Sequence, residues 1–257
     1  MAIPINSEEV LSPPMPSATV IVLRDGDAGL EVLMVRRHGA SAVLGGAHVF
    51  PGGKLDGADT RSKPAARTPE ALRQALGEPG LDLPTALGLF VAARRETQEE
   101  VALTLDIDAL VPWSRWITPR VPSVTNRRFD ARFFAVRLPD GQTPVADAHE
   151  ATEAVWLTPR EGLTRYWDGA MDLAPPQIMT LAELMRFNRT ADALAHAAAR
   201  RPPLIEPHPF DDAGRRVVCY PGDPAHPIPE RVWDGPTRLT HRNRRFEPDG
   251  GLEALLG

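Results

Sequence analysis

Apolar stretches separated by turn residues predict a β-hairpin near the start of the chain. Residues 17–23 are apolar and rich in β-branched side chains, which is typical of a buried strand. The turn residues at 24–29 separate this stretch from a second apolar run at 30–36. A glycine-rich stretch at 45–53 follows, and we expect a short strand at 47–50 within it.

A longer helix is predicted from about residue 86 to residue 101. Phe90, Ala93, Thr97 and Val101 recur at the i, i+3, i+7 and i+11 spacing of one helix face. We expect this apolar face to pack on the sheet, because an amphipathic helix buries its apolar stripe.

The rest of the chain alternates between strand and helix patterns and ends in a proline-rich tail. Strands are expected at 113–117, 128–137 and 154–157, and helices at 69–76, at 159–166 and within 175–199, where one or two are expected. Thr68 and Thr158 are candidate helix caps. These elements favour an α/β fold, a mixed sheet covered by helices.

We expect the chain to form one domain with an extension. Residues 1–200 would be the domain, including an insertion at about 60–88 and the helices within 175–199. Ten of the 27 prolines fall after residue 200, so residues 201–257 are expected to form an extended segment packed on the domain.

Composition narrows the classes of partner and site. The net charge of −5 argues against a nucleic-acid-binding surface. Cys219 is the single cysteine, which excludes an intrachain disulfide and a cysteine-cluster metal site. No apolar run approaches the ~20 residues that span a bilayer, and the start lacks the features of a secretory signal. We therefore expect a cytoplasmic protein without a membrane partner, and a homodimer remains open.

Three carboxylates mark the expected helix as a candidate metal site. Glu96, Glu99 and Glu100 stand at i, i+3 and i+4, so they project from one side of a helical turn. Such oxygen ligands suit Mg²⁺ or Mn²⁺ together with a substrate phosphate. The alternative is a solvated charged face on which Arg95 pairs with Glu99.

A glycine turn upstream supports the metal-site interpretation. Gly52 and Gly53 follow Phe50 and Pro51, and a backbone without side chains lets a phosphate or a metal ion approach closely. By itself the motif could be an ordinary tight turn. Its combination with the three carboxylates is much rarer than either feature alone.

Together the two segments resemble the Nudix box, the signature of the Nudix hydrolases. That pattern is Gly, five residues, Glu, seven residues, Arg-Glu, an apolar residue, any residue, Glu-Glu, any residue, Gly and an apolar residue. The matching positions in this chain are Gly53, Asp59, Arg95, Glu96, Glu99, Glu100 and Leu103. The resemblance implies the Nudix α/β/α sandwich, with the metal ions on the helix of the box.

Three departures of this box from the family pattern concern its first acidic residue, the end of its helix and its spacing. Asp59 replaces the usual glutamate, and Ala102 replaces the glycine that ends the helix, which should destabilise the helix C-terminus. Between Asp59 and Arg95 stand 35 residues, 60–94, where the family has seven, an insertion of 28.

A box split in this way resembles the peroxisomal coenzyme A diphosphatase branch of the family. An upstream motif of the family's coenzyme A hydrolases also matches in part, at Leu33, Arg37, Gly46, Phe50, Pro51, Gly52, Gly53 and Asp56. It fails at Ala42, where the motif has a second arginine, and at His38, where it has serine or alanine.

The resemblance implies roles for the residues of the box. Glu99 and Glu100 would be the principal metal ligands, Glu96 and the Gly53 carbonyl would complete the site, and Arg95 would orient the carboxylates by ion pairing. Arg37, Gly52 and Gly53 are the expected substrate contacts.

Residues outside the box are weaker candidates. Glu150 resembles the loop glutamate that serves as general base in some family members, although an exposed loop glutamate is an equal alternative. Arg128, beside Arg127, could bind phosphate, or both could lie on an exposed edge strand. Trp113 and Trp116 could stack on a base or belong to the core.

The implied reaction is hydrolysis of a diphosphate bond in a small-molecule nucleoside diphosphate linked to a group X. The sequence leans to coenzyme A or acyl-coenzyme A, with 3′,5′-ADP and (acyl-)4′-phosphopantetheine as products. The alternatives are an ADP-ribose or nucleotide-sugar diphosphatase and a non-catalytic nucleotide-sensing module. The complete set of three glutamates argues against the sensing module.

Overall fold

A mixed eight-stranded sheet forms the centre of the computed structural model, which describes residues 5–41, 44–63, 66–149 and 151–257. The path through the sheet is β3-β2-β1-β6-β5-β8, while β4 pairs with β1 and β7 pairs with β2. The strands are β1 (Met15–Gly26), β2 (Gly29–Arg37), β3 (His48–Val49), β4 (Gly52–Lys54), β5 (Val111–Ile117), β6 (Phe129–Arg137), β7 (Ala151–Leu157) and β8 (Leu204–Ile205).

Strand β1 organises the sheet because it pairs with three neighbours. It runs parallel to β6 from Met15 to Leu23. On its other edge it is antiparallel to β4 near its beginning and to β2 near its end, where the predicted hairpin is confirmed. The short β4 thus lies in the sheet plane beside Ser17–Thr19, and the glycine turn is built into the sheet.

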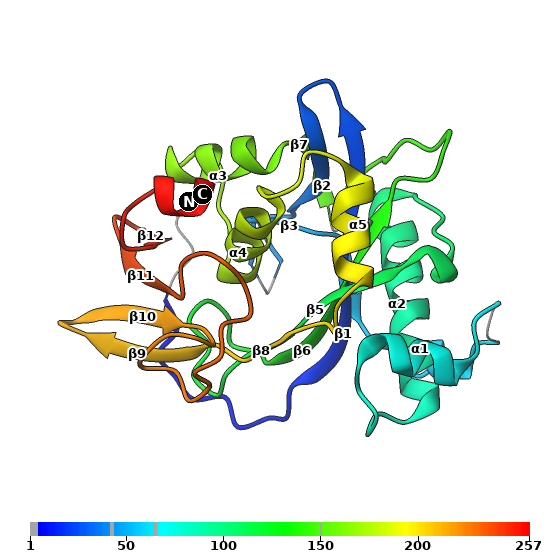
Figure 1. Ribbon diagram of the computed structural model, residues 1–257, viewed down its shortest axis with the longest axis horizontal. Coiled ribbons are helices and arrows are strands. Elements are labelled where there is room, and N and C mark those ends of the chain that lie inside the picture. The colour runs from blue at the N-terminus through cyan, green and yellow to red at the C-terminus, as the bar shows by residue number, and fades with distance from the viewer. Residues whose placement is uncertain (1–4, 42–43, 64–65, 150) are drawn as a thin grey trace.

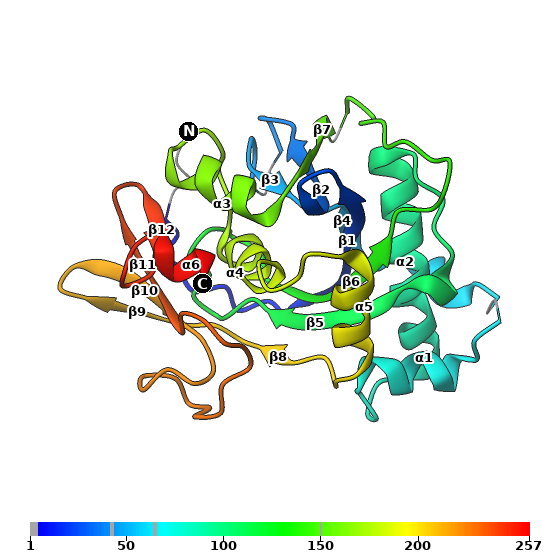
Figure 2. The same cartoon turned by 45° about the horizontal axis from the view of Figure 1, so that its top comes forward.

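Helices cover both faces of this sheet (Figures 1 and 2). One face packs against α1 (Pro69–Leu76) and α2 (Leu83–Val101), in a core that includes Val20 and Phe134. The other face packs against α3 (Pro159–Trp167), α4 (Pro175–Leu184) and α5 (Thr190–Ala198). The predicted α/β class with a mixed sheet is confirmed.

Local capping sets the helix boundaries. The predicted caps at Thr68 and Thr158 are confirmed, since each side chain accepts a hydrogen bond from the first turn of its helix. Helix α2 begins three residues earlier than predicted because the Asp82 carboxylate accepts a hydrogen bond from Thr85 N, at 2.9 Å. The 175–199 stretch forms two helices, α4 and α5.

The insertion between the two halves of the box docks on the sheet. It begins within a 3-10 turn, η1 (Asp59–Arg61), and it contains α1 and the start of α2. After α1, the Glu78 carboxylate accepts hydrogen bonds of 3.0 and 2.7 Å from Arg132 of β6, and it pairs at 2.8 Å with Arg115 of β5. A second short turn, η2 (Ile107–Ala109), leads from α2 to β5.

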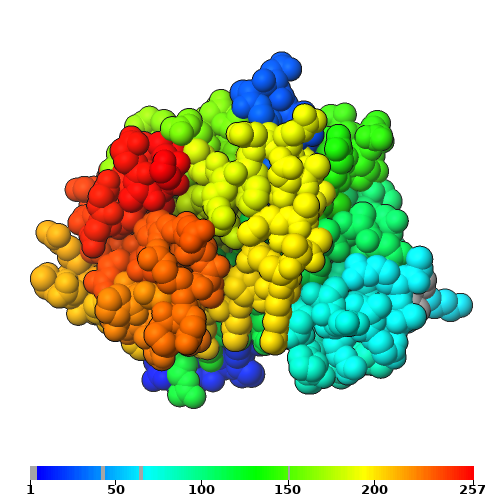
Figure 3. Space-filling model, viewed as in Figure 1, coloured from blue at the N-terminus to red at the C-terminus, as the bar shows by residue number. Residues whose placement is uncertain are grey.

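The segment after residue 200 contains strands that its prolines concealed in the sequence. After β8 it forms an antiparallel sheet of order β12-β11-β10-β9, made of β9 (His208–Asp212), β10 (Arg215–Cys219), β11 (Arg238–Arg242) and β12 (Arg245–Glu247), and then α6 (Glu253–Leu256). Its apolar side chains join the core on the α3–α5 face. Figure 3 shows this tail, in orange and red, across the face from the insertion, in cyan.

Among the described residues, no helix combines the length and the apolar character needed to cross a membrane.

The end of α2 confirms the expected C-terminal weakness. Ala102 is the C-cap and has φ 58° and ψ 23°, a left-handed conformation that costs alanine free energy and that glycine adopts freely. We expect Ala102→Gly to raise the free energy of unfolding by about 1 kcal/mol in a denaturant titration. The matched control, Ala75→Gly in the last turn of right-handed α1, should lower it by up to about 1 kcal/mol. A neutral or destabilising Ala102→Gly would contradict this assignment.

Candidate active site

A cavity of about 580 Å³ opens beside the glycine turn and the end of α2. Its walls come from β1, β4, α2, the β5–β6 connection, the start of α4 and the tail. Of the candidate residues from the sequence, it brings together Arg37, Gly52, Gly53, Arg95, Glu96 and Glu99. None of the described insertion residues, 60–63 and 66–88, lines it.

The glycine turn and α2 contact each other directly. Gly52 N donates a hydrogen bond of 3.1 Å to the carboxylate of Glu100. Glu100 is only 3% exposed. A Cβ built on Gly53 would overlap the Glu96 carboxylate. A side chain at position 53 would therefore displace Glu96, so the close packing of the turn on α2 requires this glycine.

Arg95 joins the acidic groups around the turn. Its guanidinium donates to both Asp59 oxygens, at 3.1 and 3.0 Å, and to Glu96 and Glu99, at 2.8 and 3.0 Å. It also donates to the Lys54 carbonyl at 2.9 Å. The hydrogen bonds to Asp59, followed by those to Glu96, raise the pKa of Arg95. The guanidinium is therefore a fixed positive charge that orients two carboxylates at the cavity wall.

Arg37 is a second cation at this wall. Its guanidinium lies 4.0 Å from the Glu100 carboxylate, and its Nε is buried without a hydrogen-bond partner within the described part of the chain. A buried donor of this kind is costly unless a ligand or water accepts from it. Arg37 therefore suits an anionic ligand.

The chemistry of these residues fits a hard divalent cation. Glu96 and Glu99 line the cavity one helical turn apart, and the missing Cβ of Gly53 leaves room for the Glu96 carboxylate beside the turn. In the present arrangement the described residues include no cluster of three His, Cys, Asp or Glu side chains close enough to hold a metal ion. Glu96 and Glu99 contact Arg95, and Glu100 contacts Gly52. The ligand set therefore stays a prediction.

The structure favours Arg127 over the expected Arg128 as a phosphate contact. Of the described residues, Arg127 lines the cavity and Arg128 does not. The Arg128 guanidinium is buried and donates to the carbonyls of Thr118, at 2.9 Å, and Ser12, at 3.5 Å. Arg128 therefore anchors the β5–β6 connection, and Arg127 is the better candidate for a phosphate contact.

Glu150 and Ala42 lie outside the described residues. The segment before β7 runs beside the end of α2, because Asp147 N donates to the Glu100 carbonyl, at 3.1 Å, and Val145 N donates to the Val101 carbonyl, at 2.9 Å. The assignment of Glu150 as a base stays a prediction.

The two tryptophans considered for base stacking are both buried. Trp113 donates to Glu183 at 2.8 Å within the core. Trp116 stacks on Trp233 of the tail, with ring centroids 6.0 Å apart, although it also borders the cavity. Trp113 is therefore a core residue, while Trp116 contributes to a cavity wall.

The N-terminal segment and β10 of the tail fix the β5–β6 connection, residues 118–128, a cavity wall that the sequence did not predict. Asn6 Nδ2 donates to the carbonyls of Pro122 and Thr125, each at 3.0 Å. Arg216 of β10 donates to the Asn6 carbonyl at 3.1 Å. No sequence signal reveals this clamp, because its partners are more than one hundred residues apart.

Comparisons with known proteins agree with this geometry. Residues 96–184 match the family described as the NUDT19 Nudix domain. Putative nudix hydrolase 7 of Caenorhabditis elegans is 26% identical over 239 residues, which cover 82% of this chain and 79% of the relative. The acyl-coenzyme A diphosphatase NUDT19 of Gallus gallus is 24% identical over 280 residues, with 79% and 74% covered.

A solved structure supports the fold. The crystal structure of a NUDIX hydrolase from Alicyclobacillus acidocaldarius has a TM-score of 0.58 and 24% sequence identity, and the match covers 72% of this chain and 97% of the other. The predicted sandwich architecture is therefore confirmed.

The contacts of Arg95 predict that lysine cannot replace it. A lysine ammonium is a point charge and cannot meet Asp59, Lys54 O and two helix glutamates at once. We expect Arg95→Lys to lower the free energy of unfolding by about 2 kcal/mol in a denaturant titration. Arg94→Lys, at the exposed neighbouring position, is the control and should change it by less than about 0.5 kcal/mol. Equal effects of the two changes would contradict the joining role of Arg95.

Proposed function

We propose that this chain, which resembles the coenzyme A diphosphatase branch of the Nudix hydrolases, cleaves the diphosphate of coenzyme A or an acyl-coenzyme A. The products would be 3′,5′-ADP and (acyl-)4′-phosphopantetheine. The observation that carries the proposal is the contact of Arg95 with Glu96 and Glu99 in the wall of a cavity bounded by Gly52 and Gly53. The charged Arg95 guanidinium thus lies near the Gly52–Gly53 backbone, which has no side chains. Binding of a diphosphate uses both a positive charge and an accessible backbone.

The substrate proposal draws on the relatives and on the cavity. Relatives from chicken, frog and human are named acyl-coenzyme A diphosphatases, at 24 to 36% identity over the aligned residues. Arg37, at the end of β2, and Arg127, in the β5–β6 connection, both line the cavity. Arginine suits bidentate phosphate contacts. A substrate with more than one phosphate group would use both arginines.

We propose Mg²⁺ or Mn²⁺ as the cofactor. Glu96, Glu99, Glu100 and the Gly53 carbonyl would hold it, and when bound it would neutralise charge on the diphosphate and acidify a bound water. Arg95 would orient Glu96 and Glu99, and the hydrogen bond from Gly52 would fix Glu100. Glu150 remains the proposed general base.

The extension is proposed as part of the active site. We treat residues 1–200 as the Nudix domain and residues 201–257 as an extension that completes the cavity wall. Pro207 and Val218 support this division of roles, because both border the cavity.

Product analysis of wild type and two variants tests the proposal. Coenzyme A, acetyl-coenzyme A, ADP-ribose, NADH and UDP-glucose would be incubated with Mg²⁺ or Mn²⁺ and analysed by mass spectrometry. We expect 3′,5′-ADP from the two coenzyme A compounds and none in EDTA. Glu99→Gln and Glu100→Gln should each lower kcat/KM at least about 100-fold, because an amide lacks the charge that binds the metal. In Glu100→Gln the amide oxygen can still accept from Gly52.

The control is Glu70→Gln at an exposed position of α1, which should leave kcat/KM within a factor of two. Cleavage of ADP-ribose or UDP-glucose alone would replace the coenzyme A assignment with one of the alternative substrates. Turnover that survives both glutamine changes would contradict the metal-site assignment.

A further inference from the structure

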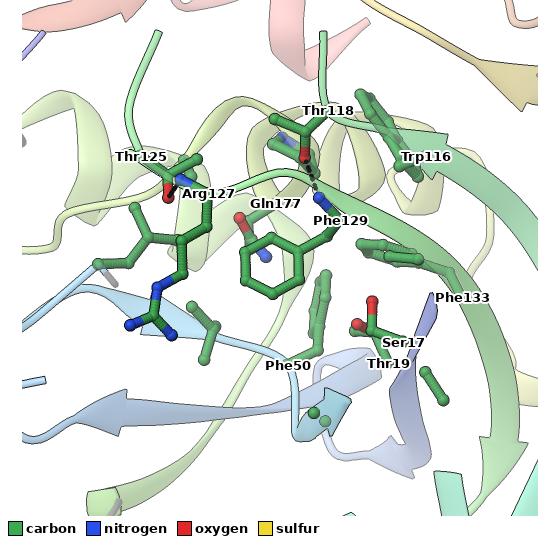
Figure 4. Close-up of a pocket in the computed structure, with 18 of the residues that line it drawn as sticks. Ser17, Thr19, Phe50, Trp116, Thr118, Thr125, Arg127, Phe129, Phe133 and Gln177 are labelled. Carbon is green, nitrogen blue, oxygen red and sulfur yellow. Dashed lines mark hydrogen bonds between the residues drawn. The ribbon is translucent and has the colours of Figure 1, made fainter. Parts of the chain in front are cut away.

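One part of the cavity is apolar and aromatic. Phe50, Phe129 and Phe133 line it together with Trp116, and Figure 4 shows these rings around a common space. Phe50 and Phe133 pack edge to face, with ring centroids 6.3 Å apart, and both are buried. Phe129 is only partly buried. Its ring can therefore contact a ligand.

The start of α4 closes this part of the cavity without offering donors to an anion. Ala174, Pro175, Pro176 and Gln177 all line the cavity. The two prolines have no N–H group, and Gln177 N already donates to the Ala174 carbonyl at 3.0 Å. The N–H groups that make a helix N-terminus an anion site are therefore missing or used here. An uncharged group suits this wall better than a phosphate does.

Gln177 places one polar group within these apolar surroundings. The residue is 7% exposed, and its Oε1 is buried without a hydrogen-bond partner in the described part of the chain. Its side chain lines the cavity, and Figure 4 shows it beside the aromatic residues. A buried carbonyl oxygen without a partner is costly, which favours a ligand that brings an N–H donor to it.

The register of the sheet sets the distance between this recess and the glycine turn. Thr19 of β1 pairs with Gly52 of β4 on one edge and with Phe133 of β6 on the other. Strands lie about 4.8 Å apart, so Gly52 and Phe133 are about 10 Å apart across β1. A diphosphate at the glycine turn and a base at Phe133 would be joined across this gap by a ribose.

We propose that this recess binds the adenine base of the substrate, with the Gln177 side-chain oxygen accepting a hydrogen bond from the exocyclic amine. The Phe129 ring would stack on the base, since nucleobases stack on phenylalanine and pair with glutamine amides. The inference rests on the proposed function in two respects, the presence of adenine in the substrate and the position of the diphosphate at Gly52 and Gly53. It makes Gln177 a specificity-determining residue that distinguishes an amino-purine from a ring with a carbonyl at the same position.

Equilibrium binding tests the inference without turnover. The ligands are adenosine 3′,5′-bisphosphate and inosine 3′,5′-bisphosphate, which differ at the exocyclic group and contain no diphosphate bond to cleave. We expect calorimetry with Mg²⁺ present to show about tenfold tighter binding of the adenosine compound by wild type. Gln177→Leu should weaken that binding about tenfold and remove the preference. Gln74→Leu, at an exposed position of α1, is the matched control and should keep both affinities.

Thermal unfolding separates ligand recognition from a structural role. Leucine removes a buried oxygen that has no partner in the described chain, so the Tm of Gln177→Leu without ligand should equal or exceed that of wild type. Gln177→Met, of similar length, should behave in the same way. A clear fall in Tm in both variants would assign Gln177 to the core and overturn the inference.

The remaining outcomes also decide the matter. Equal affinity of wild type for the two bisphosphates, or binding of neither, would overturn the inference. An equal loss of both affinities in Gln177→Leu would mean that Gln177 contacts a part that the two ligands share, such as the ribose, and would also overturn it. If the base preference depends on Gln177 but the product analysis shows no cleavage of any diphosphate, the assignment of the recess as a base site would be supported. The proposed reaction would then be wrong.

Discussion

The site depends on the hydrogen bonds that the guanidinium of Arg95 donates. The guanidinium connects Asp59 before the insertion, the Lys54 carbonyl at the end of β4, and two glutamates on its own helix. Without this positive charge, the neighbouring carboxylates would repel one another and the helix would lose its link to the strand. A single side chain thus holds together two halves of a motif that 35 residues separate in the chain. The insertion is tolerated because it docks on β5 and β6 through Glu78, away from the cavity.

The cavity combines two chemically different regions because the sheet positions two sets of elements on its opposite faces. Helix α2 covers one face and brings carboxylates to the glycine turn, where β4 is short. Helix α4 and the tail cover the other face and bring Gln177 and apolar residues. Strand β1 separates these regions, and the clamp through Asn6 and Arg216 fixes the connection that carries Arg127. The pairing of β1 with β4 and β6 therefore fixes the distance between the glycine turn and the aromatic recess.

Local rules predicted the elements whose signals lie within a few residues. Thr68 and the hairpin turn are examples, and so are the glutamates on one side of α2. The strands of the tail were not predicted, because strands of five residues or fewer show little alternation and β9 itself contains Pro209. The choice between Arg127 and Arg128 needed the tertiary structure, since both precede β6 and only the fold shows which of them lines the cavity. No sequence pattern marked Gln177, because only tertiary packing brings it to the same cavity as Phe50 and the two phenylalanines of β6.

Anomalous diffraction from crystals soaked with Mn²⁺ and 3′,5′-ADP would test the central claim most directly, which is that Arg95 and the glycine turn arrange the α2 carboxylates for a metal ion. We predict an anomalous peak within coordinating distance of Glu99, with further ligands from Glu96, Glu100 or the Gly53 carbonyl, and loss of this peak in Glu99→Gln. Well-ordered crystals with Mn²⁺ bound elsewhere, or with no Mn²⁺ at saturating concentration, would contradict the account.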